Sequence, residues 1–407
     1  MTNIDSETRV DKKKEAQRAI YLLLTIMWYK EIIGQKSIVH QLDDALKNNR
    51  IAHAQLFIGK AGSGTLQLAL AYIKAIVGHV RNGEFLEQGD AISCGKMDRF
   101  IHPDVHFVYP VNKTNEISSD KLTSDNFIEH WRTLVSKNPF IDIHDWYQQI
   151  GIGNKQGLIS VNESSDILKK LSLKPFEGDY KVMLIWLPEK MNSSAANKLL
   201  KILEEPPSKT VFILVSENAD QIIPTILSRT QIIRVPPLAT EDIEQALLAQ
   251  QASPTDAAQI ARLSNGDFNR ALSLVNNDGA SAVIQEKFRE WMRLCFAKKV
   301  AELLKWSESF SKNTREDIKT FLEYGLHLFR ESLIMNYGSE EVLKTAPNEE
   351  AFLLKFAPFV NQANCITFIN EFEKAIRDIE RNANGKILFF DLSIKVMQQI
   401  RIKPTEE

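Results

Sequence analysis

The sequence predicts an α/β domain, with a parallel sheet and flanking helices, followed by an all-helical region. Two continuous apolar runs, at 181–187 and 210–215, are typical of strands buried on both faces of a parallel sheet. Between them, apolar residues recur at three- and four-residue spacing from Ala196 to Leu203, which predicts a helix with one apolar face. From Ala280 onward the apolar spacing is helical, and a last long helical pattern runs from Phe368 to Ile402.

Residues that favour helix ends bracket this predicted helix. Asn192 and Ser193 are good starting residues, because their side chains can accept hydrogen bonds from the first backbone N–H groups. The segment 205–207, Glu-Pro-Pro, ends the helix because proline lacks an N–H and clashes with the preceding turn. After the second strand, a short helical segment ends at Ser228-Arg229, which we expect outside the sheet.

Length and composition indicate an ordinary globular protein of about two to four domains. The 407 residues are 44% hydrophobic and 25% charged, with a net charge of −2. This balance disfavours a protein whose main activity is to bind duplex DNA through a basic face. The three cysteines lie far apart, as in proteins of the reducing cytosol. No stretch reaches the roughly 18 apolar residues of a membrane helix, so we expect a cytoplasmic protein with no membrane partner.

A glycine-rich turn follows the short apolar run at 55–58 and precedes a helical pattern. Strand, glycine-rich turn and helix are the context of a phosphate-binding loop, whose working motif is G-x-x-x-x-G-K-[ST]. Gly59 and Gly64 occupy the glycine positions. Thr65 replaces the lysine that meets the phosphates, and Leu66 replaces the hydroxyl that binds Mg²⁺. The sequence therefore predicts the shape of the loop without its chemistry, and no nucleotide cofactor.

Two motifs in the core region carry a family resemblance. The segments 197–201 and 203–207 form the first motif, and 225–229, Thr-Ile-Leu-Ser-Arg, forms the second, one strand later. Together they closely resemble bacterial clamp-loader subunits of the AAA+ class. The resemblance covers residues 27–278 well, apart from an insertion at 111–156, and the last third of the chain loosely. Residues 1–26 also fall outside it.

The resemblance implies how the chain is divided. Residues 1–26 are expected to be an N-terminal extension, and 27–236 an AAA+ base domain with an insertion near 111–156. Residues 237–278 are expected to form a small helical lid. The last segment, 279–407, is expected to form a helical collar domain that holds sister subunits together.

The core strand departs from the pattern of an ATP-hydrolysing subunit. Such a subunit ends this strand with Asp-Glu, one carboxylate for Mg²⁺ and one to polarise the attacking water. Trp186 and Leu187 stand at these positions, and Glu189, two residues further on, is expected on the surface. An ATP-hydrolysing loader or recombination motor is therefore the weaker alternative, and a direct DNA-binding module is weaker still.

The pair Ser228-Arg229 keeps its chemistry. The resemblance implies that Arg229 acts in trans, as an arginine finger on ATP held by a neighbouring subunit, with Ser228 as its motif partner. A planar, permanently charged guanidinium suits phosphate oxygens. The alternative for Arg229 is an internal salt bridge that caps the helix.

The implied function is that of a non-hydrolysing subunit of the clamp loader, within the replicative DNA polymerase holoenzyme. The implied partners are the loader's ATPase subunits and a delta-type subunit in a hetero-oligomer. The sliding clamp and primer–template DNA are expected to be reached through that complex. No ATPase activity of the chain's own is expected.

In the predicted lid, Thr240 and Ser253-Pro254 are expected to start helices. The segment 264–272 resembles the loader lid motif whose arginine, Arg270 in this chain, faces the nucleotide. If the nucleotide site is inactive, Arg270 can instead hold the lid to the base domain through a carboxylate. Both roles stay open.

Related chains carry a four-cysteine zinc module where this chain has Cys94 alone, with Met97 and Phe100 at further cysteine positions. A structural zinc site needs four nitrogen or sulfur ligands, so no metal is expected and Cys94 is predicted to lie in a solvent-exposed loop. The next polar segment, 111–156, is predicted to hold one or two short helices. Its aromatic residues are expected to anchor it to the base domain rather than to stack on nucleic acid: Phe127, Trp131, Phe140 and Trp146.

Overall fold

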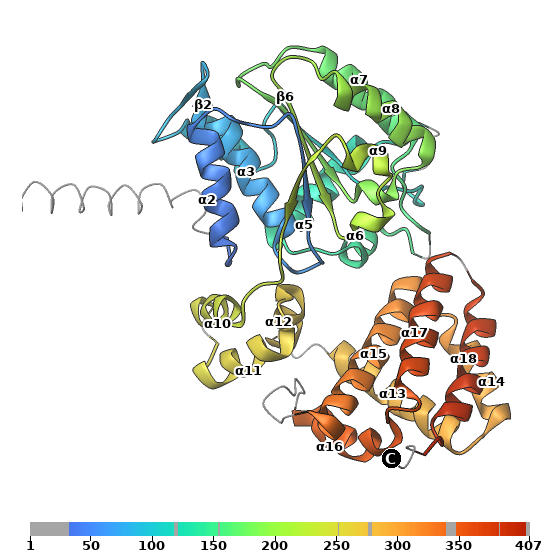
Figure 1. Cartoon of the computed structure of the whole chain (residues 1–407). Coiled ribbons are helices and arrows are strands. Elements are labelled where there is room, and N and C mark those ends of the chain that lie inside the picture. Colours follow the sequence, from blue (N-terminus) through green and yellow to red (C-terminus); the bar gives the residue numbers. More distant parts are fainter. Residues whose placement is uncertain are drawn as a thin grey trace, which may run out of the picture. The chain divides into compact units, whose positions relative to one another are not determined.

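The computed structural model describes seven stretches of the chain (Figure 1): 32–117, 121–153, 155–250, 252–275, 279–338, 347–381 and 383–403. The predicted extension, residues 1–26, lies outside them. The described chain divides into two compact units, one up to residue 257 together with 266–270, and the other 258–265 together with residues from 271 onward. The helices predicted to form the lid are therefore shared between the two units.

A parallel sheet of five strands forms the centre of the first unit, as predicted. The order across the sheet is β4 (Val105–Val108), β5 (Lys181–Trp186), β6 (Thr210–Ser216), β1 (Ala54–Ile58) and β7 (Gln231–Arg234). Every residue of β5 and β6 is buried, which confirms the prediction from their continuous apolar runs.

Helices cover both faces of this sheet (Figure 1). Side chains of β5 alternate between the two layers, with Leu184 in one core and Met183 in the other. The first core includes residues of α2 (Lys36–Lys47), α3 (Thr65–His79), α5 (Ile128–Lys137) and α6 (Ile143–Ile150). The second core includes residues of α7 (Val161–Ser172), α8 (Ser193–Glu204) and α9 (Pro224–Leu227).

The ends of α8 agree with the residues predicted to set them. The side chain of Asn192 accepts a hydrogen bond from the backbone N of Ala195 at 2.7 Å. The helix stops at Glu204, just before the two prolines. Beyond β6, the short helices η4 (Ala219–Gln221) and α9 lead to Ser228 and Arg229, outside the sheet as expected.

The segment 111–156 is part of the first core. It contains η2 (Ser124–Phe127), α5 and α6, in agreement with the predicted short helices. Trp131 is fully buried and stacks on Tyr109, just after β4, with ring centroids 4.5 Å apart. Trp146 is also fully buried, and its indole N–H donates to the carbonyl of Pro110 at 2.7 Å. The anchoring role predicted for the aromatic residues is confirmed.

Three helices follow the sheet: α10 (Thr240–Ala249), α11 (Pro254–Ser264) and α12 (Phe268–Val275). Ser253 caps α11, because its hydroxyl accepts from the backbone N of Asp256 at 3.2 Å. The helix expected to start at Thr240 does start there, although Thr240 is not its capping residue. Ala239 holds the capping position of α10, so Thr240 is already the first helical residue.

The second unit is built from helices packed around an aromatic core that includes Phe288, Trp291, Phe321 and Phe389. Its helices are α13 (Gly279–Phe296), α14 (Val300–Phe310), α15 (Arg315–Tyr337), α16 (Pro347–Phe356), η6 (Ala357–Phe359), α17 (Cys365–Glu380) and α18 (Gly385–Gln399). The single long helical pattern expected over 368–402 is in fact two packed helices, because Asn384 caps a new one by accepting from the backbone N of Ile387. No helix in the described part of the chain is long and apolar enough to span a membrane.

Candidate functional site

The loop after β1 connects that strand to α3 through a glycine-rich turn, as predicted. Gly62 and Gly64 have φ angles of +73° and +81°, in the left-handed region that favours glycine. Gly59 has another constraint, because a Cβ there would lie 2.3 Å from Oγ1 of Thr65. Gly64 then caps α3, which starts at Thr65. The glycines are therefore required by the shape of the loop.

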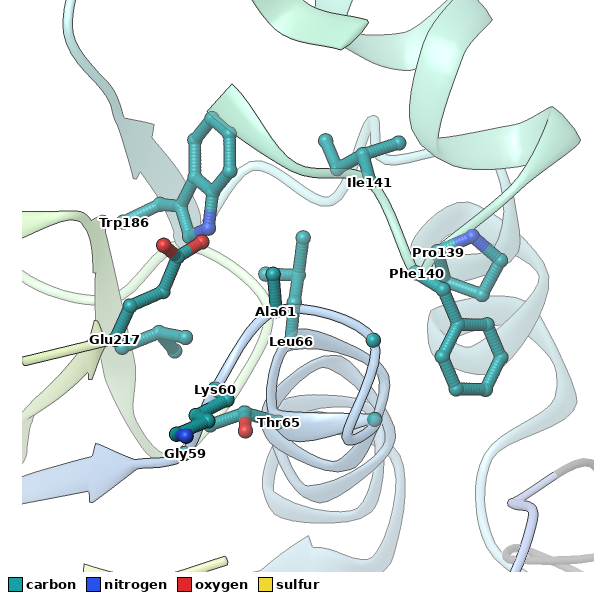
Figure 2. Close-up of a pocket in the computed structure, with 13 residues that line it drawn as sticks. Gly59, Lys60, Ala61, Thr65, Leu66, Pro139, Phe140, Ile141, Trp186 and Glu217 are labelled. Atoms are coloured by element: carbon teal, nitrogen blue, oxygen red, sulfur yellow. The ribbon is translucent and has the colours of Figure 1, made fainter. Parts of the chain in front are cut away.

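At the motif positions of the lysine and the hydroxyl, this loop offers neither a cation nor a free hydroxyl, although it carries an exposed lysine, Lys60, five residues earlier (Figure 2). Thr65 is buried, and its Oγ1 lies 2.7 Å from Oγ of Ser63, within hydrogen-bond distance. Leu66 is buried in the first core. In the working motif, these two positions hold the phosphate-binding lysine and the Mg²⁺-binding hydroxyl. In this chain both are buried and contribute to packing.

The cavity at the loop is small. Its volume is about 20 Å³, which is room for about one water molecule. The predicted site residues Gly59, Gly64, Thr65, Leu66 and Trp186 all line it, whereas Leu187 and Arg270 do not. It is also lined by residues that we did not single out as site residues, among them Lys60, Pro139, Phe140, Ile141 and Glu217 (Figure 2). Lys60 is the one cation among the lining residues, and a space of this size does not hold a triphosphate.

The end of β5 is apolar, as the sequence shows. Trp186 is buried, with its ring centroid 5.4 Å from that of Trp131. Leu187 is buried as well and has a left-handed backbone, with φ of 57°. The surface position expected for Glu189 is wrong. Its Oε1 accepts from the backbone N of Glu217 at 3.0 Å, and burial raises the pKa of its carboxyl.

Residues 266–270 pack directly on the glycine loop. The backbone N of Phe268 donates to the carbonyl of Gly62 at 2.9 Å, and the ring of Phe268 lies 4.7 Å from that of Phe140. Oδ1 of Asp267 is so close to Gly62 that a Cβ there would lie 1.7 Å from it. The loop therefore serves as a contact surface for this segment.

Arg270 lies on the first turn of α12. Its backbone N donates to Oδ1 of Asp267 at 3.1 Å. Burial raises the pKa of Asp267, and the charge of Arg270 offsets part of this effect. Among the described residues the Arg270 side chain forms no ion pair, so neither of the two roles considered for it is tested by a contact.

Cys94 lies in a helix and is buried, so the exposed loop predicted for it is wrong. Helix α4 (Ala91–Asp98) is capped by Asp90, whose side chain accepts from the backbone N of Ile92 at 3.0 Å. The helix packs on α3 where Gly78 has no side chain, since a Cβ there would lie 2.3 Å from Sγ of Cys94. Burial raises the pKa of the Cys94 thiol to about 11.

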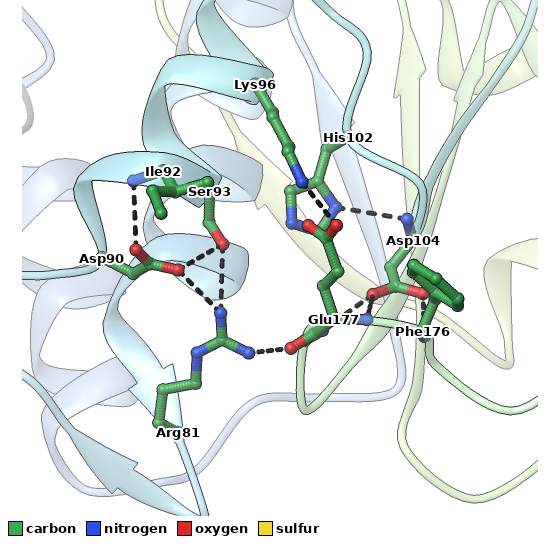
Figure 3. A network of polar contacts seen from close by, with 10 residues as sticks. Arg81, Asp90, Ile92, Ser93, Lys96, His102, Asp104, Phe176 and Glu177 are labelled. Carbon is green, nitrogen blue, oxygen red and sulfur yellow. Dashed lines mark hydrogen bonds and ion pairs between the residues drawn. The ribbon is translucent and has the colours of Figure 1, made fainter.

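A polar network holds the surroundings of α4 (Figure 3). Arg81 donates to the carboxylate of Asp90 at 2.8 Å and to the backbone carbonyl of Glu177. Oδ2 of Asp104 accepts from the backbone N of Glu177 at 2.7 Å and of Gly178 at 2.8 Å. Over the described stretches, no group of three or more His, Cys, Asp or Glu side chains could hold a metal ion. Ion pairs and backbone hydrogen bonds therefore order this region.

Arg229 lies just beyond α9 at the edge of the first unit. Its guanidinium forms an ion pair with Glu204, the last residue of α8. Its Nη1 donates to the carbonyl of Thr225 at 3.0 Å and to the hydroxyl of Ser228 at 3.2 Å. The Arg229 side chain is still 33% exposed. The internal salt bridge considered as the alternative is present, and the guanidinium remains accessible.

The parallel sheet with helices on both faces, followed by a helical region, defines a protein of the α/β class, and comparison with known proteins gives the family. Residues 34–239 match the family described as "DNA polymerase III, delta subunit". Because this range is half of the chain, the chain belongs to that family. The matched range includes 111–156, which the motif resemblance leaves outside.

Two curated relatives with similar sequences are named as subunits of DNA polymerase III. The chain is 25% identical to DNA polymerase III subunit delta' of Bacillus subtilis over 79% of this chain and 83% of the relative. It is 24% identical to DNA polymerase III subunit tau/gamma of Haemophilus influenzae, over 63% of this chain and only 32% of that longer protein. A gamma subunit-related protein of Thermotoga maritima aligns over 89% of this chain and 100% of its own, with a TM-score of 0.37 and 15% identity.

Proposed function

We propose that this chain is a non-hydrolysing clamp-loader subunit that donates Arg229 in trans to ATP bound by a neighbouring ATPase subunit. The proposal rests on a contrast: the cavity at the loop after β1 is small, whereas the guanidinium of Arg229 is accessible. The delta' and tau/gamma relatives support assembly with ATPase subunits and a delta-type subunit. The sliding clamp and primer–template DNA are then reached through the complex.

The loop supports the absence of hydrolysis by this chain. No cation fills the lysine position, because Thr65 is turned to Ser63 and Leu66 is packed in the core, and Lys60 stands five residues too early in the motif. The carboxyl group of Glu217 borders the cavity, and a carboxylate there repels phosphate (Figure 2). Trp186 cannot bind Mg²⁺ or polarise a water molecule. An ATP-hydrolysing motor would need a lysine at position 65 and carboxylates at the end of β5, and this chain has neither.

The trans role is tested in the loader reassembled from its native partners. We expect Arg229→Ala to leave assembly intact and to depress ATP turnover stimulated by DNA and clamp. The matched control is Arg234→Ala, which removes another exposed arginine of the first unit that has no ion pair among the described residues. Unchanged ATP turnover with Arg229→Ala would contradict the trans role. A large fall in the melting temperature of the variant would show that the internal salt bridge is its main function.

The loop is tested on the isolated chain by calorimetry with Mg-ATP. We expect no binding in the micromolar range, because the cavity is small and no lysine stands at the phosphate-binding position. Magnesium-dependent binding with micromolar affinity would overturn the interpretation of Thr65 and Leu66 and would favour the hydrolysing alternative.

A further inference from the structure

Glu204 stands at a position that its own helix does not favour. It is the last residue of α8, and the C-terminal end of a helix dipole disfavours an acidic side chain. Its neighbour Leu203 is buried in the second core of the sheet, whereas the Glu204 side chain is 47% exposed. Packing therefore does not account for Glu204, and its one ion pair among the described residues is with Arg229.

The contacts of Arg229 leave part of its guanidinium open. A guanidinium has five N–H donors. Nη1 uses its two on the carbonyl of Thr225 and the hydroxyl of Ser228, and Nη2 meets Glu204. The N–H of Nε and one N–H of Nη2 have no acceptor within the described stretches. These two donors belong to a side chain that is one-third exposed.

We infer that Glu204 is a positioning residue for the arginine finger: it holds the Arg229 guanidinium so that its two free donors face phosphate oxygens of the neighbour's ATP. The inference rests on the proposed trans role of Arg229. A long side chain that is already fixed loses less conformational freedom when it meets its ligand. Glu204 and Thr225, from two different helices, fix the guanidinium from two directions.

The strength of the pair is compatible with this role. Ion pairs at exposed sites are weak, so Glu204 does not compete strongly with a triphosphate for the guanidinium. An arginine can also keep one carboxylate contact while it binds phosphate through its other donors. The ion pair can therefore orient the Arg229 side chain without preventing it from binding phosphate.

The test uses ATP turnover by the reassembled loader that contains Glu204→Ala, with Glu205→Ala as the matched control. Glu205 is the adjacent exposed acid and has no ion pair among the described residues. We expect Glu204→Ala to lower kcat about two- to five-fold, the range that an exposed ion pair supplies, with little change in KM. Glu204→Gln keeps an acceptor oxygen and should lose less. Glu205→Ala should leave kcat unchanged.

A double-mutant cycle with Arg229→Ala separates positioning from a structural effect. If Glu204 acts through Arg229, the double variant should have the same kcat as Arg229→Ala alone. Independent, multiplicative losses would contradict the inference, as would a higher kcat for Glu204→Ala, which would mean that the pair restrains the arginine. If Arg229→Ala lowers kcat and Glu204→Ala does not, the positioning role of Glu204 is wrong and the trans role of Arg229 stands. No loss with Arg229→Ala overturns the trans role and, with it, the positioning.

Discussion

The loop after β1 and the segment after β6 both follow strands of the same sheet, but they retain different things. The loop retains a backbone, with Gly62 and Gly64 in left-handed conformations, while the side chains of Thr65 and Leu66 are buried. The segment after β6 retains a side chain, the accessible Arg229, on an ordinary helix end. The difference teaches that the shape of a loop is not evidence of its chemistry, because packing alone can preserve it.

The preserved shape has a structural reason in this molecule. Nε2 of Gln35 donates to the carbonyl of Ser63 at 3.2 Å and to that of Pro236 at 2.7 Å. On another side, Gly62 receives the backbone N–H of Phe268 and touches Asp267. The loop therefore joins the first described residues, the end of the sheet and the segment 266–270. A contact surface of this kind constrains the glycines even without a nucleotide.

The largest effect is expected at the arginine segment. Arg229→Lys should lower turnover at the served ATP site almost as much as Arg229→Ala, by a factor on the order of 10³. A lysine keeps the charge but presents a point charge on a flexible stem instead of a planar fork. ATPase of the reassembled loader, with the variant as the only source of this subunit, measures the change. A lysine variant with normal turnover would mean that charge alone matters.

At the loop, restoring the missing residues should harm the protein. The double change Thr65→Lys and Leu66→Thr should cost on the order of 3 kcal/mol in the free energy of unfolding, because both positions are buried. It should confer no ATP hydrolysis, since Trp186 and Leu187 still provide no carboxylate. Denaturant unfolding and a radiolabelled ATPase assay measure the two outcomes. A stable, hydrolysing variant would remove the distinction between the two regions.

The contact made by Gly62 should depend on its lack of a side chain. Gly62→Ala should lose about 2 kcal/mol in the free energy of unfolding, because φ is +73° and the new Cβ would meet Oδ1 of Asp267. Gly95→Ala is the control. Gly95 lies inside α4 with nothing within 4 Å of its Cβ position, so alanine there should gain about 0.5–1 kcal/mol. Equal responses to urea would show that the loop bears no such contact.

The smallest effect contrasts the exposed charge of Arg229 with a buried one. Burial raises the pKa of Glu163 from 4.5 to about 7, although its Oε2 accepts from the backbone N of Ser124 at 2.6 Å. The folded state thus holds a proton that the unfolded chain releases, so this group stabilises most below its unfolded pKa, and the contribution is lost as pH rises through 7.

Glu163→Gln removes this dependence. Relative to the unmodified chain, it should gain on the order of 1–2 kcal/mol in unfolding free energy between about pH 5 and pH 8. Thermal melts over this range measure the difference between the two proteins. A constant difference across the range would show that the carboxyl of Glu163 is already ionised in the folded state.

The sheet and its helices were predictable because their signals are local. Continuous apolar runs identify β5 and β6, and Asn192 with Pro206 sets the ends of α8. The errors have non-local causes. Cys94 is buried because a glycine one helix away leaves room for it, and Glu189 turns inward because a backbone N–H at the end of another strand is within reach.

The candidate site was predictable only where a motif names its residues. Residue type alone shows that Thr65, Leu66 and Trp186 cannot bind phosphate or Mg²⁺ or polarise a water molecule. Glu217 borders the same cavity because β6 runs beside β5 in register, with Val215 opposite Trp186, and this pairing is not written in either segment. A position directly after a buried parallel strand is nevertheless a usable signal, since the strands' carboxyl ends share one edge of the sheet. Glu204 lies in a recognisable motif, but the sequence does not show that its partner is Arg229. The ion pair becomes evident only in the structure, where α8 contacts α9.

The burial of Cys94 has a practical consequence for experiments on the whole complex. The other two cysteines, Cys295 and Cys365, are also buried and unpaired, and burial raises the pKa of the Cys295 thiol to about 12. Alkylating reagents attack accessible thiolates, so the native chain should be almost inert to them. A cysteine introduced in place of the exposed Glu205 would then be the one reactive thiol, and a cross-linker attached to it would identify the subunit that Arg229 approaches.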